Sequence, residues 1–283
     1  MFVTVSSRRP SGIELLSKLN DDTVEVVPEE IITGGQSPEQ NTKFNLQLMT
    51  DSKDRAAKVA LERAGFKVPV TSTGAVITDA SPELPVAKVV TPGETVVGAD
   101  GKEITSADEL VKVITSHKPG DSITLELEPF GPGPAREVTV TLGERPDEPG
   151  APLLGVSLED RPDFDFPIDV DIDSDRVGGP SAGLAFTLAI LDRLTPGKLT
   201  GDGKVAVTGT INLDGSVGPV GGVRQKTEAA IREGAKVFIV PSDEYRDAKD
   251  AAGDRIKIRQ ADTLEAALEI LEALGGDPVP AVD

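Results

Sequence analysis

The sequence contains no cysteine and a single histidine, His117, among its 283 residues. The absence of cysteine excludes disulfides, thiolate metal sites and a cysteine nucleophile. The lone histidine excludes any mechanism that needs two imidazoles. Aromatic residues are also scarce, at 3%, so the core must be built mainly from Val, Ile, Leu and Ala. No run approaches the roughly 18 to 20 apolar residues that span a bilayer, and the first residues lack the basic and apolar regions of a secretory signal.

Basic residues are outnumbered by acidic ones. The chain has 29 Lys and Arg against 48 Asp and Glu, which gives a net charge of −19. This excess is shared almost equally, with −9 in residues 1–150 and −10 in residues 151–283. A negative field over the whole surface repels phosphate backbones and anionic lipids. We therefore expect no nucleic-acid partner.

The length corresponds to about two domains at roughly 150 residues each, and the local patterns predict an α+β fold. Residues 1–50 alternate short apolar runs with polar turns, which predicts strands around one short helix over 12–19. A second helix is expected over 51–64. From residue 65 to 143 the pattern is rich in strands. A proline-rich segment, residues 144–152, predicts a linker.

The individual elements follow from periodicity and turn signals. In the strand-rich part we expect strands over 74–77 and 95–99, a turn at Asp100-Gly101, a helix over 106–116 capped by Thr105 or Ser106, and a hairpin of 123–128 with 136–142. Beyond the linker, alternating apolar and acidic residues predict a strand over 163–175. The remaining expected elements are helices over 181–194, 223–233 and 262–274, the last with a capping box of Asp262 and Glu265, and strands over 204–213 and 237–240.

One serine stands in a run of small residues where an acidic segment meets an apolar helix: Gly178-Gly179-Pro180-Ser181-Ala182-Gly183. The unpaired N–H groups and positive dipole end of a helix start can hold a developing oxyanion. The run also satisfies the G-x-S-x-G pattern of serine hydrolases. However, no histidine follows Ser181, which excludes a Ser-His-Asp triad of that type. A serine that caps the helix, with glycines that serve the turn, is the structural alternative.

If Ser181 is a nucleophile, a lysine can be its base once burial lowers the amine pKa from about 10.4 toward neutrality. The helix expected over 223–233 supplies a candidate. On a helical wheel Lys226 falls on the flank of the apolar face, away from the outer charges Arg224 and Glu228. The side chain of Lys226 can lie buried there or extend to solvent.

Two motifs in this order resemble the proteolytic domain of Lon proteases. They are G-P-S-A-G at residues 179–183 and VTGTINLDGSVGPVGGVRQK at residues 207–226. The resemblance covers about residues 155–275 and implies the ribosomal protein S5 domain 2-like α/β fold. Two positions depart from the common Lon pattern, because Gly178 and Thr210 stand where an acidic residue is usual.

The resemblance also implies the roles of the site residues. In that family the serine of the first motif is the nucleophile and the lysine that ends the second is the general base, here Ser181 and Lys226. Thr208 is expected to help orient the lysine. The other supporting residues are those around the serine: Gly179, Pro180 and Ala182.

The form V-G-G-P-S-A-G-L is similar to that of bacterial Lon-like proteins that combine a PDZ domain with the protease domain. On this resemblance we expect N-terminal strands and a helix over 1–54 that pack on the protease domain, a PDZ-like domain over 55–143, a linker over 144–152 and the protease domain over 153–283. The expected carboxylate-binding loop is Gly65-Phe66-Lys67-Val68, where backbone N–H groups would capture a peptide C-terminus. A plain turn after the helix is the alternative.

The chain carries no ATPase motif. Walker A requires G-x-x-x-x-G-K, and none of the Gly-Lys pairs of this sequence fits it. We therefore expect neither ATP nor any other cofactor. The acidic residues of 163–175 do not match an EF-hand frame, so no metal is expected. The resemblance further implies an N-terminal membrane anchor upstream of Met1, a protease domain on the extracytoplasmic side of the cell membrane, and assembly into a homo-oligomer.

These observations predict an ATP-independent serine endopeptidase with a Ser181–Lys226 dyad that cleaves unfolded or recruited proteins and peptides. The PDZ-like domain would recognise C-termini or gate the site. Two alternatives stay open. One is an inactive peptide-binding adaptor, for which the departures at Gly178 and Thr210 leave room. The other is a protease that processes only itself.

Overall fold

The structure is a computed structural model that describes residues 1–5, 7–11, 14, 24–33, 38–131, 133–174, 177–201 and 203–280. The chain forms two compact units. The larger unit joins Met1–Val68 to Phe166–Asp283, and the smaller unit is Pro69–Asp165. The mixture of helices and strands confirms the α+β class. Among the described residues, no helix has the length and apolar character needed to cross a membrane.

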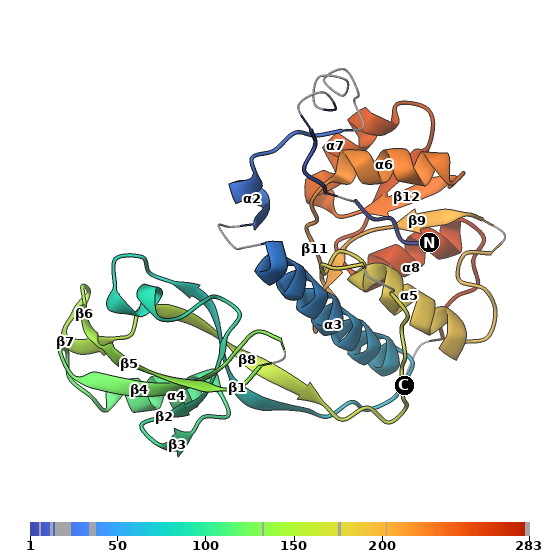
Figure 1. Ribbon diagram of the computed structural model, residues 1–283. Coiled ribbons are helices and arrows are strands. Elements are labelled where there is room, and N and C mark those ends of the chain that lie inside the picture. The colour runs from blue at the N-terminus through green and yellow to red at the C-terminus, as the bar shows by residue number, and fades with distance from the viewer. Residues whose placement is uncertain are drawn as a thin grey trace. The chain divides into compact units, whose positions relative to one another are not determined.

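The smaller unit is built on one antiparallel sheet of order β5-β4-β2-β1-β8, with β3 paired to β2 (Figure 1). Its elements are β1 (Val70–Ala80), the 3-10 helix η1 (Pro85–Lys88), β2 (Thr95–Ala99), β3 (Lys102–Glu103), α4 (Ala107–Thr115), β4 (Ser122–Glu128), β5 (Arg136–Thr141), β6 (Gly143–Arg145), β7 (Glu148–Leu153) and β8 (Val156–Phe164). Ile77, Leu110 and Leu125 are fully buried at its centre. The expected strands, the Asp100-Gly101 turn and the helix capped by Ser106 are confirmed.

The larger unit contains a parallel sheet of order β13-β12-β9 and a hairpin of β10 with β11. Its elements are α2 (Glu29–Thr33), α3 (Pro38–Arg63), α5 (Gly183–Leu194), β9 (Val205–Val207), β10 (Thr210–Ile211), β11 (Val217–Gly218), α6 (Val223–Arg232), β12 (Val237–Val240), α7 (Ser242–Ala252), β13 (Lys257–Gln260) and α8 (Leu264–Ala273). Successive strand residues face opposite sides of the sheet. Val237 and Ile239 therefore pack with α3, α5 and α8, whereas Phe238 and Val240 pack with α6 and α7.

The first residues of the chain extend this sheet. Phe2 forms a parallel bridge with Val207 of β9, and Val207 N donates to Met1 O at 3.0 Å. The ring of Phe2 meets Phe186 of α5 edge-on, with 5.5 Å between centroids. The N-terminal residues therefore pack in the larger unit. The strands expected over 1–50 are wrong for the described residues, because Phe2 forms only an isolated bridge and residues 29–33 and 38–50 are helical. The helix expected over 12–19 lies outside the described residues, apart from Glu14.

The boundaries of the two units differ from those expected from the sequence. Residues 55–63, assigned to the PDZ-like domain, form the last nine residues of α3 in the larger unit, because their alanines are buried in its core. Residues 144–152 are not a linker, since most of them belong to the β6–β7 hairpin. Residues 153–165, assigned to the protease domain, complete the smaller unit, where β8 pairs with β1 from Val156 to Phe164.

The acidic segment 163–175 is not one strand. Strand β8 ends at Phe164, and no regular element is assigned to residues 165–174. Pro167 has no N–H to donate to a ladder. The apolar residues beyond it pack individually on the core of the larger unit, namely Phe166, Val170 and Ile172. In this irregular segment these apolar residues face the core and the acidic residues between them face solvent. The sequence therefore alternates with a period of two, as it would in a half-buried strand.

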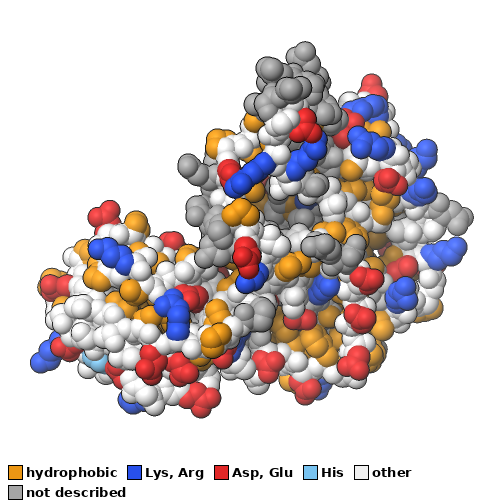
Figure 2. Space-filling model, in the orientation of Figure 1, with side chains coloured by type: hydrophobic (Ala, Val, Ile, Leu, Met, Phe, Trp, Pro, Cys, Tyr) orange, Lys and Arg blue, Asp and Glu red, His pale blue; other side chains and the backbone are white. Residues whose placement is uncertain are grey.

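Three further details in the larger unit correct the expectations. The strand over 204–213 is interrupted at Thr208-Gly209, which separates β9 from β10. Helix α8 is capped by Thr263, whose side chain accepts from Ala266 N, in place of Asp262. Helix α7 and strand β13 were not expected. Acidic side chains are scattered over the visible face of both units (Figure 2), as the even division of charge predicts.

Candidate active site

The residues Gly178–Ala182, here named the serine loop, lead directly into α5. The helix begins at Gly183, and its N-cap is Ala182, which makes no side-chain capping bond. Ser181 is therefore not the helix cap, so the structural alternative for this serine does not hold. The side chain of Ser181 is only partly buried and lines a cavity of about 620 Å³.

Helix α3 binds the backbone of the serine loop. Gly179 N donates to Asn45 O at 2.7 Å, and Ser52 Oγ donates to Pro180 O at 3.1 Å. A Cβ on Gly178 would lie 2.9 Å from Asn45 Cβ, so a larger residue would push the loop away from the helix. This close approach gives a physical reason for glycine at a position where an acidic residue is usual in Lon proteases.

Lys226 lies on the first turn of α6 and is only 3% exposed. Burial lowers its pKa from 10.5 to about 8, because the ammonium loses the water that solvates it, while the negative charge of Glu244 acts in the opposite direction. The sequence left a buried and an exposed lysine as alternatives. The structure shows the buried one, with an amine that is partly neutral near pH 8.

Thr208 connects the lysine to the serine loop. Its side chain is fully buried. Lys226 Nζ donates to Thr208 Oγ1 at 3.2 Å, and Thr208 Oγ1 in turn donates to Ser181 O at 3.1 Å. Gly209 N donates to the same carbonyl at 3.0 Å. Thr208 and Gly209, the two residues between β9 and β10, therefore fix the position of the Ser181 backbone, and Thr208 also fixes the amine of Lys226.

The glycine-rich loop before α6, Gly218–Gly222, brings Lys226 to this place. Gly222 has φ 67°, in the left-handed region that favours glycine, and its carbonyl accepts from Lys226 N at 3.0 Å. Val220 N donates to Glu244 Oε1 at 3.1 Å, which ties the loop to α7.

Segments far apart in the sequence form the walls of the cavity. Besides Ser181 and Lys226, its lining comprises Thr4, Val5, Ser7, Met49, Val177, Gly178, Pro180, Ala182 and Gly221. Apart from Lys226 these residues carry no charge. The contributions of α3 and of the N-terminal segment were missed at the sequence level, because no local pattern marks a residue that reaches the site from more than 100 positions away. Within the described ranges, no three His, Asp or Glu side chains are placed to hold a metal ion.

The sequence predicted that the carboxylate-binding loop, Gly65 to Val68, belongs to the PDZ-like domain. In the structure this segment belongs to the larger unit, at the end of α3. Gly65 N donates to Glu62 O and Phe66 N donates to Leu61 O, both at 2.9 Å, which is the pattern of a helix C-cap. Two of the N–H groups expected to capture a peptide are thus used by the helix, and the segment is the turn that the alternative proposed.

Comparison with known proteins bears on the larger unit. Residues 167–274 match the model of the Lon protease (S16) C-terminal proteolytic domain. This segment is similar to the Lon proteolytic domain. It contains Ser181, Thr208 and Lys226. The match starts after α3 and the N-terminal residues, so the parts of the chain that complete the cavity lie outside it.

Curated Lon proteases are also similar to part of the chain. Over 100 residues the chain is 38% identical to the Lon protease of Rickettsia typhi, and the aligned part is 35% of this chain and 12% of the relative. Over 165 residues it is 30% identical to the Lon protease of Mycoplasma mycoides, and the aligned part is 54% of this chain and 20% of the relative. The chain therefore corresponds to at most about a fifth of these relatives.

Solved structures of PDZ domains are similar to about a third of the chain. The PDZ domain of an SdrC-like protein from Listeria monocytogenes covers 32% of this chain and 92% of its own, with 23% identity and a TM-score of 0.29. That of the Listeria innocua protein covers 30% and 92%, with 21% identity and a TM-score of 0.27.

Proposed function

We propose that the chain is a serine endopeptidase in which Ser181 is the nucleophile and Lys226 the general base. The observation that carries this proposal is the buried amine, which lines the same cavity as Ser181 and has a pKa of about 8. A lysine with the ordinary pKa of about 10.4 is almost fully charged at neutral pH and cannot accept a proton.

The reaction runs through an acyl-enzyme. Neutral Lys226 takes the hydroxyl proton as Ser181 Oγ bonds to the peptide carbonyl carbon, and the carbonyl electron pair moves to the oxygen. When the intermediate collapses, the C–N bond breaks and the leaving amine receives the proton from Lys226. Water then attacks the ester with Lys226 again as base, which releases the acid and restores Ser181. Thr208 keeps Nζ in place through both steps.

The oxyanion requires N–H donors near Ser181. Three amides around the serine loop are already engaged within the protein: Gly179 N with Asn45 O, Gly183 N with Pro180 O, and Leu184 N with Gly209 O. The amides of Ser181 and Ala182, at the positive end of the α5 dipole, are the donors that we assign to the oxyanion.

We propose that this cleavage needs no ATP, because the sequence carries no Walker A motif, and that it acts on polypeptides already unfolded or recruited. An extended chain fits an open cavity whose lining residues, apart from Lys226, carry no charge. From the resemblance to Lon-like proteins with a PDZ domain, we place the activity on the outer side of the cell membrane.

The smaller unit offers an edge for recruitment. In the described part of the chain, β8 is the last strand of its sheet, with β1 on one side only. Helix α4 is fixed beside it, since Ala107 N donates to Asp160 Oδ1 at 2.7 Å. A peptide added antiparallel to β8 would place its C-terminus near Val156, where the strand begins. We propose this edge as the peptide site in place of residues 65–68.

The decisive test of the protease is cleavage of an unfolded protein without ATP by wild type, Ser181→Ala and Lys226→Ala. We expect cleavage by wild type alone, and labelling of wild type but not Ser181→Ala by a fluorophosphonate. Retained turnover in either variant contradicts the dyad. A chain that binds peptides but is never labelled is an adaptor, and one that only shortens itself, as seen by mass spectrometry, is a self-processing protease.

Recruitment is tested separately. Fluorescence anisotropy should detect binding of a peptide with a free apolar C-terminus, and amidation of that terminus should weaken binding by about tenfold or more, because the charge is lost. Equal binding of both forms contradicts capture of a carboxylate at β8.

A further inference from the structure

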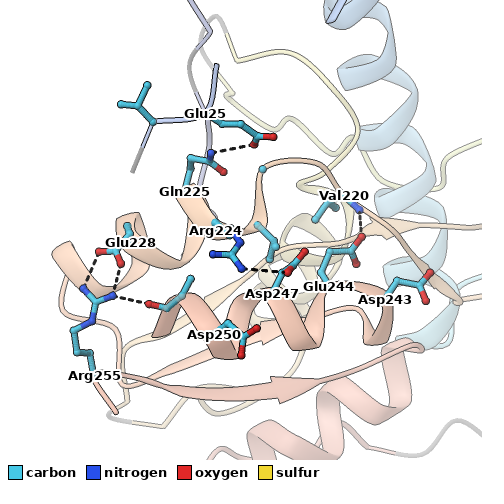
Figure 3. A pocket seen from close by; sticks show the side chains of 14 residues that line it. Glu25, Val220, Arg224, Gln225, Glu228, Asp243, Glu244, Asp247, Asp250 and Arg255 are labelled. Atoms are coloured by element: carbon cyan, nitrogen blue, oxygen red, sulfur yellow. Dashed lines mark hydrogen bonds and ion pairs between the residues drawn. The ribbon is translucent and has the colours of Figure 1, made fainter. Parts of the chain in front are cut away.

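Glu244 of α7 contacts the loop that leads to Lys226. One carboxylate oxygen, Oε1, accepts the bond from Val220 N (Figure 3). The other, Oε2, is buried and has no hydrogen-bond partner in the part of the chain that the structure describes. A buried carboxylate oxygen without a donor destabilises the fold unless a nearby positive charge compensates it. Glu244 thus has a free acceptor that the fold itself does not use.

The other charges on the neighbouring elements are already paired or face solvent. Those of α6, α7 and Glu25 lie around a second cavity, on the side of α6 that faces α7, which Lys226 does not line (Figure 3). They are Arg224 paired with Asp247 and Arg255 paired with Glu228, Glu25 bonded to Gln225, and the exposed Asp243 and Asp250. On α3, Asp51 accepts from Gln47. The residues that the N-terminal segment adds to the cavity, Thr4, Val5 and Ser7, are uncharged.

We propose that Glu244 is a positioning residue for Lys226, with one oxygen that fixes the loop into α6 and a second that stabilises the ammonium formed when Lys226 takes the proton of Ser181. The inference rests on the proposed protease function. Among the described residues Glu244 makes no hydrogen bond or ion pair with Lys226. It therefore orients the lysine only through the loop and acts on the ammonium as a nearby negative charge, as the carboxylate of a Ser-His-Asp triad stabilises the cation of its base. The proposal gives a role at Lys226 to α7, which lies outside both sequence motifs and lines the second cavity.

The variant Glu244→Gln separates the two roles. The amide oxygen still accepts from Val220 N, so the loop stays anchored, but the negative charge is removed. Without that charge the ammonium is less stable, so the pKa of Lys226 falls further. Because the base must be neutral, the rising limb of the pH–rate profile moves to lower pH, by about 0.5 to 1 unit. The plateau rate also falls, by about threefold to tenfold, because the ammonium formed in acylation loses its partner.

The experiment measures Lys226 and Ser181 independently. The titration of Lys226 is followed by NMR on protein labelled at lysine Cε, with Lys226→Arg to identify its signal. The pH dependence of fluorophosphonate labelling reports on Ser181. Asp250→Asn is the matched control, because it removes the same charge from the same helix. Asp250 is exposed and lines the same second cavity as Glu244.

We expect both titrations to move down in Glu244→Gln and to stay at the wild-type value in Asp250→Asn. Unchanged titration of Lys226 in Glu244→Gln, or an equal shift in both variants, overturns the positioning role. If the NMR titration moves but wild-type Ser181 is not labelled at any pH, the effect of Glu244 on the lysine stands and the protease proposal fails.

Discussion

Activity should rise with pH through the pKa of Lys226. With a pKa of about 8, about one tenth of the molecules carry a neutral Lys226 at pH 7 and about nine tenths at pH 9. If the proton transfer to Lys226 limits acylation, kcat/KM for a peptide substrate increases about tenfold over this range and then levels off. An unshifted lysine would leave only about 0.03% neutral at pH 7, roughly 300-fold less base. The lowered pKa is therefore large enough to decide whether the site works at neutral pH.

The assay is kcat/KM for an internally quenched peptide between pH 6 and 10, with Ser181→Ala as the background and circular dichroism at each pH to show that the chain stays folded. A midpoint near 8 supports Lys226 as the base. A flat profile, or one that keeps rising to a midpoint above 10, refutes the reasoning, because it means that Lys226 either does not titrate in the reaction or is not desolvated.

Three other substitutions test the energetics of the site. Lys226→Met should raise the free energy of unfolding at pH 7 by up to about 3 kcal/mol, since the lysine then no longer buries an amine whose pKa is lowered from 10.5 to about 8. This gain in stability should shrink between pH 8 and 10.5, because in that range the native lysine has lost its proton and the unfolded one has not. Urea unfolding that gives the same gain at pH 7 and at pH 10 contradicts this prediction. Thr208→Val should slow labelling of Ser181 by about tenfold or more and lower the free energy of unfolding by about 1–3 kcal/mol, because Nζ loses its acceptor; unchanged labelling would show that Thr208 does not position the lysine. Ser52→Ala should lower kcat/KM several-fold by freeing Pro180 O, whereas Thr50→Ala, exposed on the same helix, should not, and equal effects of the two would rule out a specific anchor.

Most elements with strong local patterns were predictable from the sequence. The apolar run that became α5, the amphipathic helix α6 and the buried strand β12 lie close to their expected places. Helix α3 was expected only over 51–64, although it begins at Pro38. Its first half is polar and has no clear apolar stripe, so local propensity does not define it. Burial of Met49 in the core and the bond between Asn45 O and Gly179 N stabilise it there.

The error at residues 65–68 has a similar origin. A glycine followed by an apolar residue after a helix is compatible with a carboxylate-binding loop and with a helix C-cap, since both use backbone N–H groups. The two differ only in where those groups point. The bonds from Gly65 N and Phe66 N back to α3 decide for the cap.

The sequence by itself determined the candidates: the lone histidine excluded an imidazole triad, and the resemblance of the two motifs to those of Lon proteases selected Ser181 and Lys226. These conclusions depend on residue types and their order, which can be read from the sequence directly. Only the tertiary structure decided that Lys226 is buried, that Thr208 bonds to both Lys226 Nζ and Ser181 O, and that α3 and the N-terminal residues line the same cavity. A pKa depends on water excluded by chain segments far apart in sequence, and no local pattern records which segments those are.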